Sequence, residues 1–241
     1  MVAKSSSNTS FKKLTSIKQL KLQANIIRED IITSLKEAKS GHSAGPLGMA
    51  DIFTALYFNV LKHNPKKPND KNRDRFILSN GHICPVLYAT MANCGYFPKK
   101  ELLTLRKLGS RLQGHPHRQA LPGLETTRGP LGSGLSQAAG MALVFKREKT
   151  PQKVWVSLGD GEQNEGNHWE AVMFAAKEKL SNIIAITDRN YIQIDGNTED
   201  VMPLDSLKKK YLAFNWNVVE INGNDMSVIL KTLKAARSNK H

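Results

Sequence analysis

The sequence predicts an α/β domain in which a doubly wound, mainly parallel sheet carries helices on both faces. First, helical and strand patterns alternate through the second half of the 241-residue chain. Second, its predicted strands, "VWVSL", "IIAIT" and "WNVVEI", are apolar runs, which is typical of strands that are buried on both faces. Third, the first half supplies amphipathic helices separated by breaks rich in glycine and proline.

The first half of the chain is predicted to be mainly helical, with one buried strand. Residues 1–10, "MVAKSSSNTS", are poor in apolar side chains and are expected to be disordered. A polar loop over 64–75 precedes "FILSNGH", which predicts a short strand that ends in a turn. Apolar residues at a helical repeat predict helices over 17–35, 51–61, 83–95 and 99–107.

The segment 109–134, "GSRLQGHPHRQALPGLETTRGPLGSG", has neither a helical nor a strand pattern. Loops of this length inside compact domains are usually functional or disordered. The regular spacing of glycine, proline and histidine within it favours a functional loop.

The second half is predicted to alternate between helices and strands. Helices are predicted over 135–147, 165–179, 204–212 and 225–236, and strands over 153–158, 182–187 and 217–221. Residues 11–241 are therefore expected to form one domain, which is large enough to bury a sizeable core.

The chain is strongly basic, with 35 Lys+Arg against 21 Asp+Glu and a formal net charge of +14. Because such a charge attracts polyanions, a nucleic-acid-binding module is one hypothesis. The lysines are scattered without interleaved aromatic residues, so this hypothesis is secondary.

The two cysteines, Cys84 and Cys94, imply no disulfide framework and suit reduced thiols that pack as small hydrophobes in a cytoplasmic protein. No apolar run approaches the roughly 18 residues of a membrane span, and no signal-peptide pattern opens the chain.

Oxygen-bearing side chains follow two of the predicted strands. Asp160 lies between Gly159 and Gly161 after "VWVSL", and Asn190 follows the next strand thirty positions later. In doubly wound sheets, ligands bind beyond the carboxyl ends of the strands. A carboxylate, an amide oxygen and a backbone carbonyl would suit Mg²⁺ that takes its other ligands from phosphate and water. The glycines permit close approach of a phosphate, and the helix from Glu165 would direct the positive end of its dipole at the anion.

A GDG sequence after a strand is by itself more often an ordinary turn than a metal site. Here its pairing with Asn190, inside a strand–helix–strand unit, favours the cation site.

The longer stretch "GDGEQNEGNHWEAVMFAAKEKLSNIIAITDRNYIQIDG" resembles the thiamine diphosphate signature, in which GDG is followed by an asparagine about thirty positions on. Three further motifs are similar, in the same order, to those of the transketolase family: "SGHSAGPLGMADI", "DRFILSNGHICPVLYA" and "QGHPHRQALPGLETTRGPLGSGLSQAAGMA". The resemblance covers about 39–196, with a weaker continuation to about 236, and implies the diphosphate domain of the thiamine-diphosphate-binding fold. The chain departs from it at "GHSAGP", where single-chain transketolases usually read "GHPGAP".

The resemblance implies a set of cofactor-binding residues. Asp160, Asn190 and the Ile192 carbonyl would hold Mg²⁺, or another divalent cation such as Ca²⁺ or Mn²⁺, on the diphosphate of thiamine diphosphate. Gly161 would lie against the diphosphate. The residues at the aminopyrimidine end of the cofactor would be Gly129, Pro130 and Leu131.

The resemblance also implies catalytic residues. His82 would face the diphosphate and the substrate, while His42 and His115 would contact substrate hydroxyls. Histidine titrates near neutrality, so it can act as a base on the C3 hydroxyl of a ketose and as an acid on the carbonyl oxygen of the acceptor. Glu165 would lie at a subunit junction, opposite a glutamate of the partner. The histidines without a counterpart in the family, predicted to be structural or exposed to solvent, are His63, His117 and His168.

The chain resembles the first subunit of the split transketolases, in which the diphosphate-binding and pyrimidine-binding domains are separate polypeptides. It is short even against that form, because the expected last strand, a glycine-rich lysine segment and a further histidine are missing after "KAARSNKH". The resemblance implies a cytoplasmic α2β2 enzyme of the pentose phosphate pathway, active only with its pyrimidine-binding partner. It would transfer a two-carbon ketol unit from a ketose phosphate to an aldose phosphate.

Other hypotheses remain open at the level of sequence. The chain could serve a related split enzyme that acts on an unusual sugar, such as a sulfo-sugar or a branched sugar. It could belong to another thiamine enzyme, a 2-oxo acid dehydrogenase or a deoxyxylulose-phosphate synthase, although the histidines argue against the dehydrogenase. It could also be a basic nucleic-acid-binding module, or an inactive scaffold, against which the retained activity-type residues argue.

Overall fold

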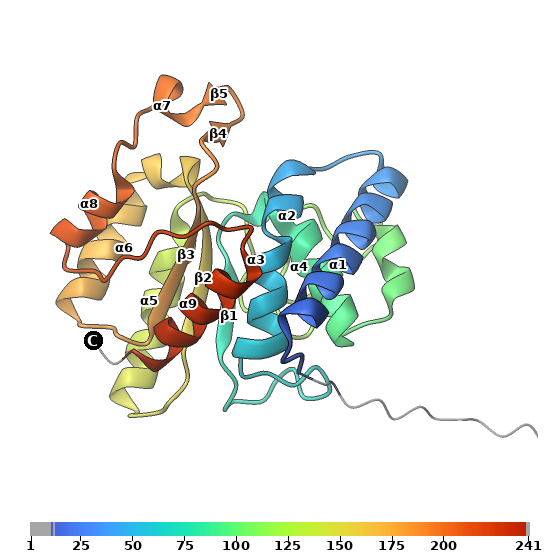
Figure 1. Ribbon diagram of the computed structural model, residues 1–241, viewed down its shortest axis with the longest axis horizontal. Coiled ribbons are helices and arrows are strands. Elements are labelled where there is room, and N and C mark those ends of the chain that lie inside the picture. Colours follow the sequence, from blue (N-terminus) through green and yellow to red (C-terminus); the bar gives the residue numbers. More distant parts are fainter. Residues whose placement is uncertain (1–10, 12, 240–241) are drawn as a thin grey trace, which may run out of the picture.

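A parallel three-stranded sheet forms the centre of the molecule (Figure 1). The computed structural model describes residue 11 and residues 13–239, so the prediction for residues 1–10 lies outside the described part of the chain. The strands β1 (Arg75–Leu78), β2 (Val154–Gly159) and β3 (Ile183–Asp188) are ordered β1-β2-β3. All three run in the same direction, so their carboxyl ends, and the loops that follow them, meet at one edge.

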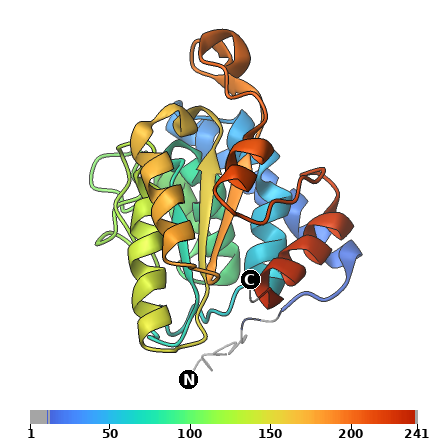
Figure 2. The ribbon, with the colours of Figure 1, turned by 90° about the vertical axis from the view of Figure 1, so that its left-hand side faces the viewer.

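Side chains of the strands point alternately into two hydrophobic cores, so both faces of the sheet are covered. In β2, Trp155 enters one core while Val154 and Val156 enter the other. The helices of the first core are α1 (Ile17–Ala38), α3 (Ala50–Ala55), α4 (Cys84–Cys94) and α9 (Met226–Ser238), and those of the second are α5 (Ser133–Arg147) and α6 (Gly166–Lys177). Figures 1 and 2 show the two helical layers on either side of the strands. This is the predicted α/β architecture with a doubly covered parallel sheet.

The long helix α1 was predicted because its apolar residues follow the helical repeat. Ser16 caps its first turn by accepting a hydrogen bond from the backbone N–H of Gln19 at 3.1 Å. Leu20, Ala24, Ile27 and Ile31, spaced three or four residues apart, are fully buried on one face. Burial of a leucine or isoleucine contributes about 1.5–3 kcal/mol, so this stripe fixes the helix against α3 and α4.

Two segments of the first half differ from the predicted helices. Residues Lys99–Thr104 form a 3₁₀ helix instead of an α-helix over 99–107. Leu102, within the helix, and Leu105, its C-cap residue, are buried, and the Leu105 N–H donates to the Leu102 carbonyl in the i to i+3 pattern of a 3₁₀ turn. The predicted break before residue 51 contains a short helix, α2 (Ala44–Gly48), and α3 continues as a π-helical turn over Leu56–Val60.

The predicted strand over 217–221 is wrong. This segment pairs with no strand in the described part of the chain, where β3 is an edge of the sheet. Its apolar side chains serve different cores, because Val218 packs against the second core and Ile221 against the first. Val219 is 68% exposed. The segment therefore crosses between the cores and does not extend the sheet.

An extension beyond β3 was not predicted. It contains the two-residue strands β4 (Ile192–Gln193) and β5 (Gly196–Asn197), which pair antiparallel, and the short helix α7 (Thr198–Val201). Figure 1 shows it projecting above the carboxyl ends of the strands. The chain then returns through α8 (Leu207–Ala213), which lies beside α6. No helix among the described residues is long and apolar enough to cross a membrane.

Candidate functional site

The loops that follow the three strands are joined by hydrogen bonds into one site. After β1, the backbone N–H of Ser79 donates to the Ser157 carbonyl at 2.8 Å. The Ser157 hydroxyl donates to Asn80 Oδ1 at 3.0 Å, and both side chains are buried. The turn after β1 is thereby held beside the end of β2, where the GDG turn begins.

Asp160 is almost completely buried and is held by donors from the loop that follows β3. Its Oδ2 accepts from the backbone N–H of Tyr191 at 2.8 Å, from Arg189 Nη1 at 3.0 Å and from Thr198 Oγ1 at 3.4 Å. Its Oδ1 accepts from the backbone N–H of Gly161 at 2.8 Å. Because the protein donors converge on Oδ2, lone-pair capacity remains on Oδ1 for a cation.

Asn190 lies at the surface, one position before Tyr191. Its Nδ2 donates to Asp188 Oδ2 at 3.0 Å, and its Oδ1 accepts from the backbone N–H of Ile192 at 2.9 Å. Burial raises the pKa of the Asp188 carboxyl, the bond from Asn190 lowers it, and the negative charge of Asp160 raises it further. The structure thus brings Asp160 and the Asn190–Ile192 loop together, as the sequence predicted.

The oxygen donors of this edge fit a hard divalent cation that is shared with a phosphate. They comprise a buried carboxylate, a surface amide oxygen and the nearby backbone of Ile192. Among the described residues, no group of three or more His, Cys, Asp or Glu side chains could hold a metal ion by itself. A cation here would need further ligands from a bound anion and from water, as Mg²⁺ accepts.

Arg189 is a residue of the site that the sequence analysis missed. Its guanidinium pairs with Asp160 at 3.0 Å and also with Glu199, and it lies over the Tyr191 ring at 4.0 Å from the centroid. The available signal was its position in the sequence, between Asp188 and Asn190. A cationic side chain at this point can balance the charge of two carboxylates, which in the structure are those of Asp160 and Glu199. Arg189 links the GDG turn to α7 and so orders the extension.

The three histidines predicted to be catalytic lie close together. The rings of His42 and His82 have centroids 5.0 Å apart. Burial lowers the pKa of His82 to about 4, and His42 and His115 lower it further by charge repulsion. Burial also lowers the pKa of His115, with Arg106 and His42 adding to the effect. His42 and His115 are exposed and His82 is half-buried, so all three are accessible from the surface.

The predicted contacts from the long loop lie at the start of α5. Gly129, Pro130 and Leu131 are exposed and immediately precede Gly132, the N-cap residue of α5. Glu165 is exposed at the N-cap position of α6 and, among the described residues, its side chain makes no capping bond. Asn167 Nδ2 donates to the Leu131 carbonyl at 3.4 Å, so the starts of α5 and α6 are adjacent.

The second residue that the sequence analysis missed is Glu162, which follows GDG. It is 4% exposed, and its carboxylate accepts three hydrogen bonds, from Ser79 Oγ and from the backbone N–H groups of Gly132 and Gly159. Burial raises its pKa, and the three hydrogen bonds lower it. A charged side chain buried beside the loops is a signal that only the structure provides.

Of the residues predicted to be structural, His168 and the two cysteines are buried. His168 is fully buried, with Nε2 2.8 Å from Tyr211 Oη, and burial lowers its pKa to about 4. Cys84 and Cys94 are buried and free, and burial raises the pKa of both thiols. His117 is half-buried in the long loop.

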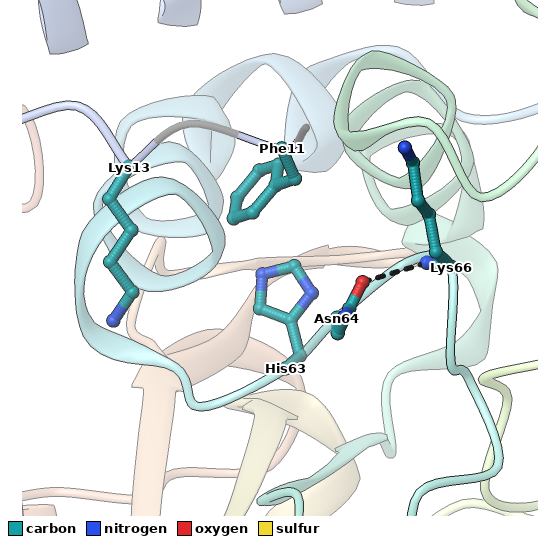
Figure 3. A pocket seen from close by; sticks show the side chains of 5 residues that line it. All are labelled: Phe11, Lys13, His63, Asn64 and Lys66. Carbon is teal, nitrogen blue, oxygen red and sulfur yellow. Dashed lines mark hydrogen bonds between the residues drawn. The ribbon is translucent and has the colours of Figure 1, made fainter. Parts of the chain in front are cut away.

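His63 lines a cavity of about 270 Å³ together with Phe11, Lys13, Asn64 and Lys66 (Figure 3). The rings of Phe11 and His63 lie next to one another, with centroids 4.8 Å apart and planes tilted by 53°. The cavity involves the loop that precedes β1, so it lies at the amino ends of the strands. It is therefore separate from the site at the carboxyl ends.

Comparison with known proteins identifies the class of protein. Residues 19–241 match the family model described as "Transketolase, thiamine diphosphate binding domain". The chain belongs to the transketolase family, and it carries the thiamine-diphosphate-binding domain of that family. Transketolase from Campylobacter jejuni has the same fold, with a TM-score of 0.88 and 35% identity over 93% of this chain and 36% of that one.

Relatives include proteins named as transketolase subunits and longer proteins named as transketolases. The chain is 41% identical over 219 residues to one subunit of the apulose-4-phosphate transketolase of Phocaeicola vulgatus, covering 91% of this chain and 78% of that protein. It is 40% identical over 218 residues to the 6-deoxy-6-sulfo-D-fructose transketolase subunit SqwG of a Clostridium species, covering 90% and 79%. Against transketolase 2 of Escherichia coli it is 39% identical over 229 residues, but spans 34% of that protein.

Proposed function

We propose that this chain is the diphosphate-binding subunit of a transketolase that depends on thiamine diphosphate and Mg²⁺. It would transfer a two-carbon ketol unit from a ketose phosphate to an aldose phosphate, together with a separate pyrimidine-binding subunit. The observation that carries the proposal is the convergence of the loops after β1, β2 and β3 around Asp160 at the carboxyl edge of the sheet. Membership of a family whose matched domain is described as thiamine diphosphate binding supports this cofactor as the ligand of that edge.

The cofactor residues are assigned from this edge. Asp160 Oδ1, the Asn190 amide oxygen and the Ile192 carbonyl would hold Mg²⁺, or Ca²⁺ or Mn²⁺ in its place. Gly161 and His82 would lie at the diphosphate. The exposed residues at the aminopyrimidine end would be Gly129, Pro130 and Leu131. This distribution is supported by the burial of Asp160 and by the donors on its Oδ2, which orient the carboxylate and leave lone-pair capacity on Oδ1.

The histidines would move the protons of the reaction. Thiamine diphosphate, when bound, supplies the reacting carbon and the electron sink. The lowered pKa of His82, about 4, keeps its imidazole neutral near pH 7, so a ring nitrogen is available to accept a proton from a substrate hydroxyl. His42 lies beside it and would, with His115, hold the hydroxyls of the sugar. Glu165 would meet a carboxylate of the partner at the start of α6.

A separate partner subunit is supported by the apolar surface beside the site. The exposed hydrophobic residues of the extension, which would be costly to leave in water, are Tyr191, Ile192, Ile194, Val201 and Met202. The extension that carries them projects above the carboxyl ends of the strands (Figure 1), and the backbone N–H of Tyr191 donates to Asp160. Relatives that are named as one subunit of a transketolase match this chain over most of its length. If each chain pairs with one pyrimidine-binding subunit and two of these pairs associate, as the family resemblance implies, the assembly would be α2β2.

An unusual sugar is the second candidate substrate. Relatives named for apulose 4-phosphate and for 6-deoxy-6-sulfo-D-fructose are 41% and 40% identical to this chain, while transketolase 2 of Escherichia coli is 39% identical. Such similar identities leave both the ordinary and the unusual sugars as donors.

We further propose that residues 11–241 act as one diphosphate domain. The two buried, free cysteines support a cytoplasmic location.

Reconstitution tests the proposed function. The chain would be mixed with a pyrimidine-binding transketolase subunit from the same organism, and ketol transfer would be followed with a panel of ketose phosphate donors. We expect transfer only when both subunits, thiamine diphosphate and a divalent cation are present. Transfer by the pyrimidine-binding subunit alone, or an undiminished rate after removal of the cation with a chelator, would contradict the proposal.

A further inference from the structure

Glu162 joins three segments of the candidate site through one buried carboxylate. Its Oε1 accepts from Ser79 Oγ at 2.5 Å and from the backbone N–H of Gly132 at 3.1 Å. Its Oε2 accepts from the backbone N–H of Gly159 at 2.8 Å. The turn after β1, the N-terminus of α5 and the end of β2 are therefore fixed to the same two atoms.

Ser79 extends this connection into α5. Its hydroxyl, which donates to Glu162, also accepts from the backbone N–H of Gly134 at 3.2 Å. A Cβ at position 134 would lie 2.3 Å from the Cβ of Ser79, so only glycine permits this approach. Gly132 has a positive φ of 74°, and a Cβ there would lie 2.8 Å from the Cβ of Glu165. The end of the segment 129–132 is thus confined from two sides.

The beginning of that segment is held by Arg128. This side chain is 5% exposed; its Nε donates to Thr126 Oγ1 at 3.0 Å, and its Nη2 is bonded to Gln137 on α5. Its positive charge also interacts with the negative charge of Glu162. Both ends of the exposed segment 129–131 are therefore anchored to buried, charged side chains.

We propose that Glu162 is a positioning residue, which sets the separation between the segment 129–132 and the GDG turn. The inference rests on the proposed function, in which the first segment meets the aminopyrimidine end of the cofactor and the second meets its diphosphate end. Because one covalently connected ligand must satisfy both contacts, an error in their separation weakens binding of the whole cofactor. Asp160 has its own partners, Arg189, Tyr191 and Thr198, so its carboxylate is held without a direct contact to Glu162.

Two substitutions separate the contacts of Glu162. In Glu162→Gln the amide oxygen can keep the bonds from Ser79 and Gly132, while the amide nitrogen faces the N–H of Gly159 and loses that bond. Glu162→Ala loses all three. Amide hydrogen exchange, resolved by residue, should therefore show faster exchange of Gly159 alone in Glu162→Gln, and of Gly132, Gly134 and Gly159 in Glu162→Ala. Unchanged exchange at all of these amides would overturn the proposal.

Ligand binding distinguishes positioning from general stabilisation. Thiamine diphosphate and inorganic pyrophosphate would each be titrated with Mg²⁺ into the complex of the chain with a pyrimidine-binding subunit. In Glu162→Ala the affinity for thiamine diphosphate should fall by about tenfold or more, while that for pyrophosphate changes by less than about twofold. Glu162→Gln should restore most of the affinity. A parallel loss for both ligands, or no loss for either, would contradict a positioning role.

The two proposals fail in different ways. If wild-type protein binds thiamine diphosphate no better than pyrophosphate, the proposed function fails, whereas the exchange experiment still measures what Glu162 holds. If Glu162→Ala does not fold, the exchange pattern of Glu162→Gln decides, because that variant retains two of the three bonds. Glu148→Gln, an exposed carboxylate after the far end of α5, is the matched control and should change neither exchange nor binding.

Discussion

The backbone N–H of Tyr191 donates a 2.8 Å hydrogen bond to Oδ2 of Asp160, thirty-one positions earlier in the chain. Tyr191 adopts a positive φ of 63°, a left-handed conformation that is uncommon for a residue other than glycine. The loops after β2 and β3 therefore form one unit. A substitution in either loop is expected to affect the cation that the other is proposed to bind.

Glu165→Gln tests the proposed subunit junction. The substitution keeps the shape of the side chain and removes its charge at the N-terminus of α6, where a carboxylate contributes about 0.3–1 kcal/mol through the helix dipole. We expect near-normal stability of the isolated chain, slower ketol transfer and weaker assembly with the pyrimidine-binding subunit. Thermal denaturation, a transfer assay and analytical ultracentrifugation measure the three effects. With Glu148→Gln as the control, wild-type transfer and assembly in Glu165→Gln would leave Glu165 an ordinary residue at a helix start.

His82→Asn tests the proposed proton acceptor. Asparagine retains hydrogen-bonding capacity but cannot take up a proton, so kcat for ketol transfer should fall by on the order of 10²- to 10⁴-fold. Binding of Mg²⁺ and thiamine diphosphate should fall much less, because the ligands of the cation are untouched. Steady-state kinetics and calorimetry separate the two quantities. The control is His117→Asn in the long loop, for which kcat should change little; equal losses in both variants would remove His82 from the mechanism.

Stability should depend on pH through the buried His168. Burial lowers its pKa to about 4, whereas in the unfolded chain it takes up a proton near 6.5. The unfolded state therefore binds the proton first as the pH falls, and the free energy of unfolding decreases between pH 6.5 and 4. In His168→Gln this contribution is absent, so the stability advantage of wild type should shrink by on the order of 2 kcal/mol between pH 7 and pH 4.

Chemical denaturation at several pH values measures this difference. Tyr211→Phe is the matched control, since it removes the hydroxyl bonded to His168 but keeps the titrating imidazole. It should lower stability and retain the pH dependence of wild type. A constant difference between wild type and His168→Gln across the pH range would show that His168 does not titrate between the folded and unfolded states.

The net charge of +14 is predicted not to be a nucleic-acid footprint. Binding to duplex DNA should be weak, independent of sequence, and lost steeply between low and moderate salt, because it depends on counterion release. Fluorescence anisotropy with two unrelated duplexes, at two salt concentrations, measures this. A sequence-selective complex that survives physiological salt would favour the nucleic-acid-binding hypothesis over the enzyme.

The sequence predicted the parts of the fold that a local pattern specifies. The strands β1, β2 and β3 were predicted because each is a short apolar run, and the helix α1 because its apolar residues follow the helical repeat. The proximity of Asp160 and Asn190 was predicted because parallel strands end at one edge. The strand prediction for residues 217–221 was wrong because the apolar side chains of this run are divided between the two cores. The run has the composition of a strand, but it pairs with no strand among the described residues.

Other features depend on contacts between distant segments and leave no local pattern. The role of Glu162 requires Ser79, eighty-three positions earlier, and Gly132, thirty positions earlier. Arg189 is adjacent to Asn190, yet its pairing with Glu199 depends on an extension with strands of only two residues, too short for a periodicity. The convergence of His42, His82 and His115 was implied by the resemblance to the family, not by their spacing.

The most direct test of the central claim is the cation dependence of cofactor binding at Asp160. Thiamine diphosphate would be titrated calorimetrically, in Mg²⁺ or in a chelator, into the chain alone and with a pyrimidine-binding subunit. The chain alone should bind weakly, the complex tightly and only with Mg²⁺. Asp160→Asn should lower the affinity of the complex by about 10- to 1,000-fold, while Asp195→Asn, an exposed aspartate of the extension, should not. Tight binding that is equal in the lone chain, or an affinity unchanged by Asp160→Asn, would contradict a shared site with its cation at Asp160.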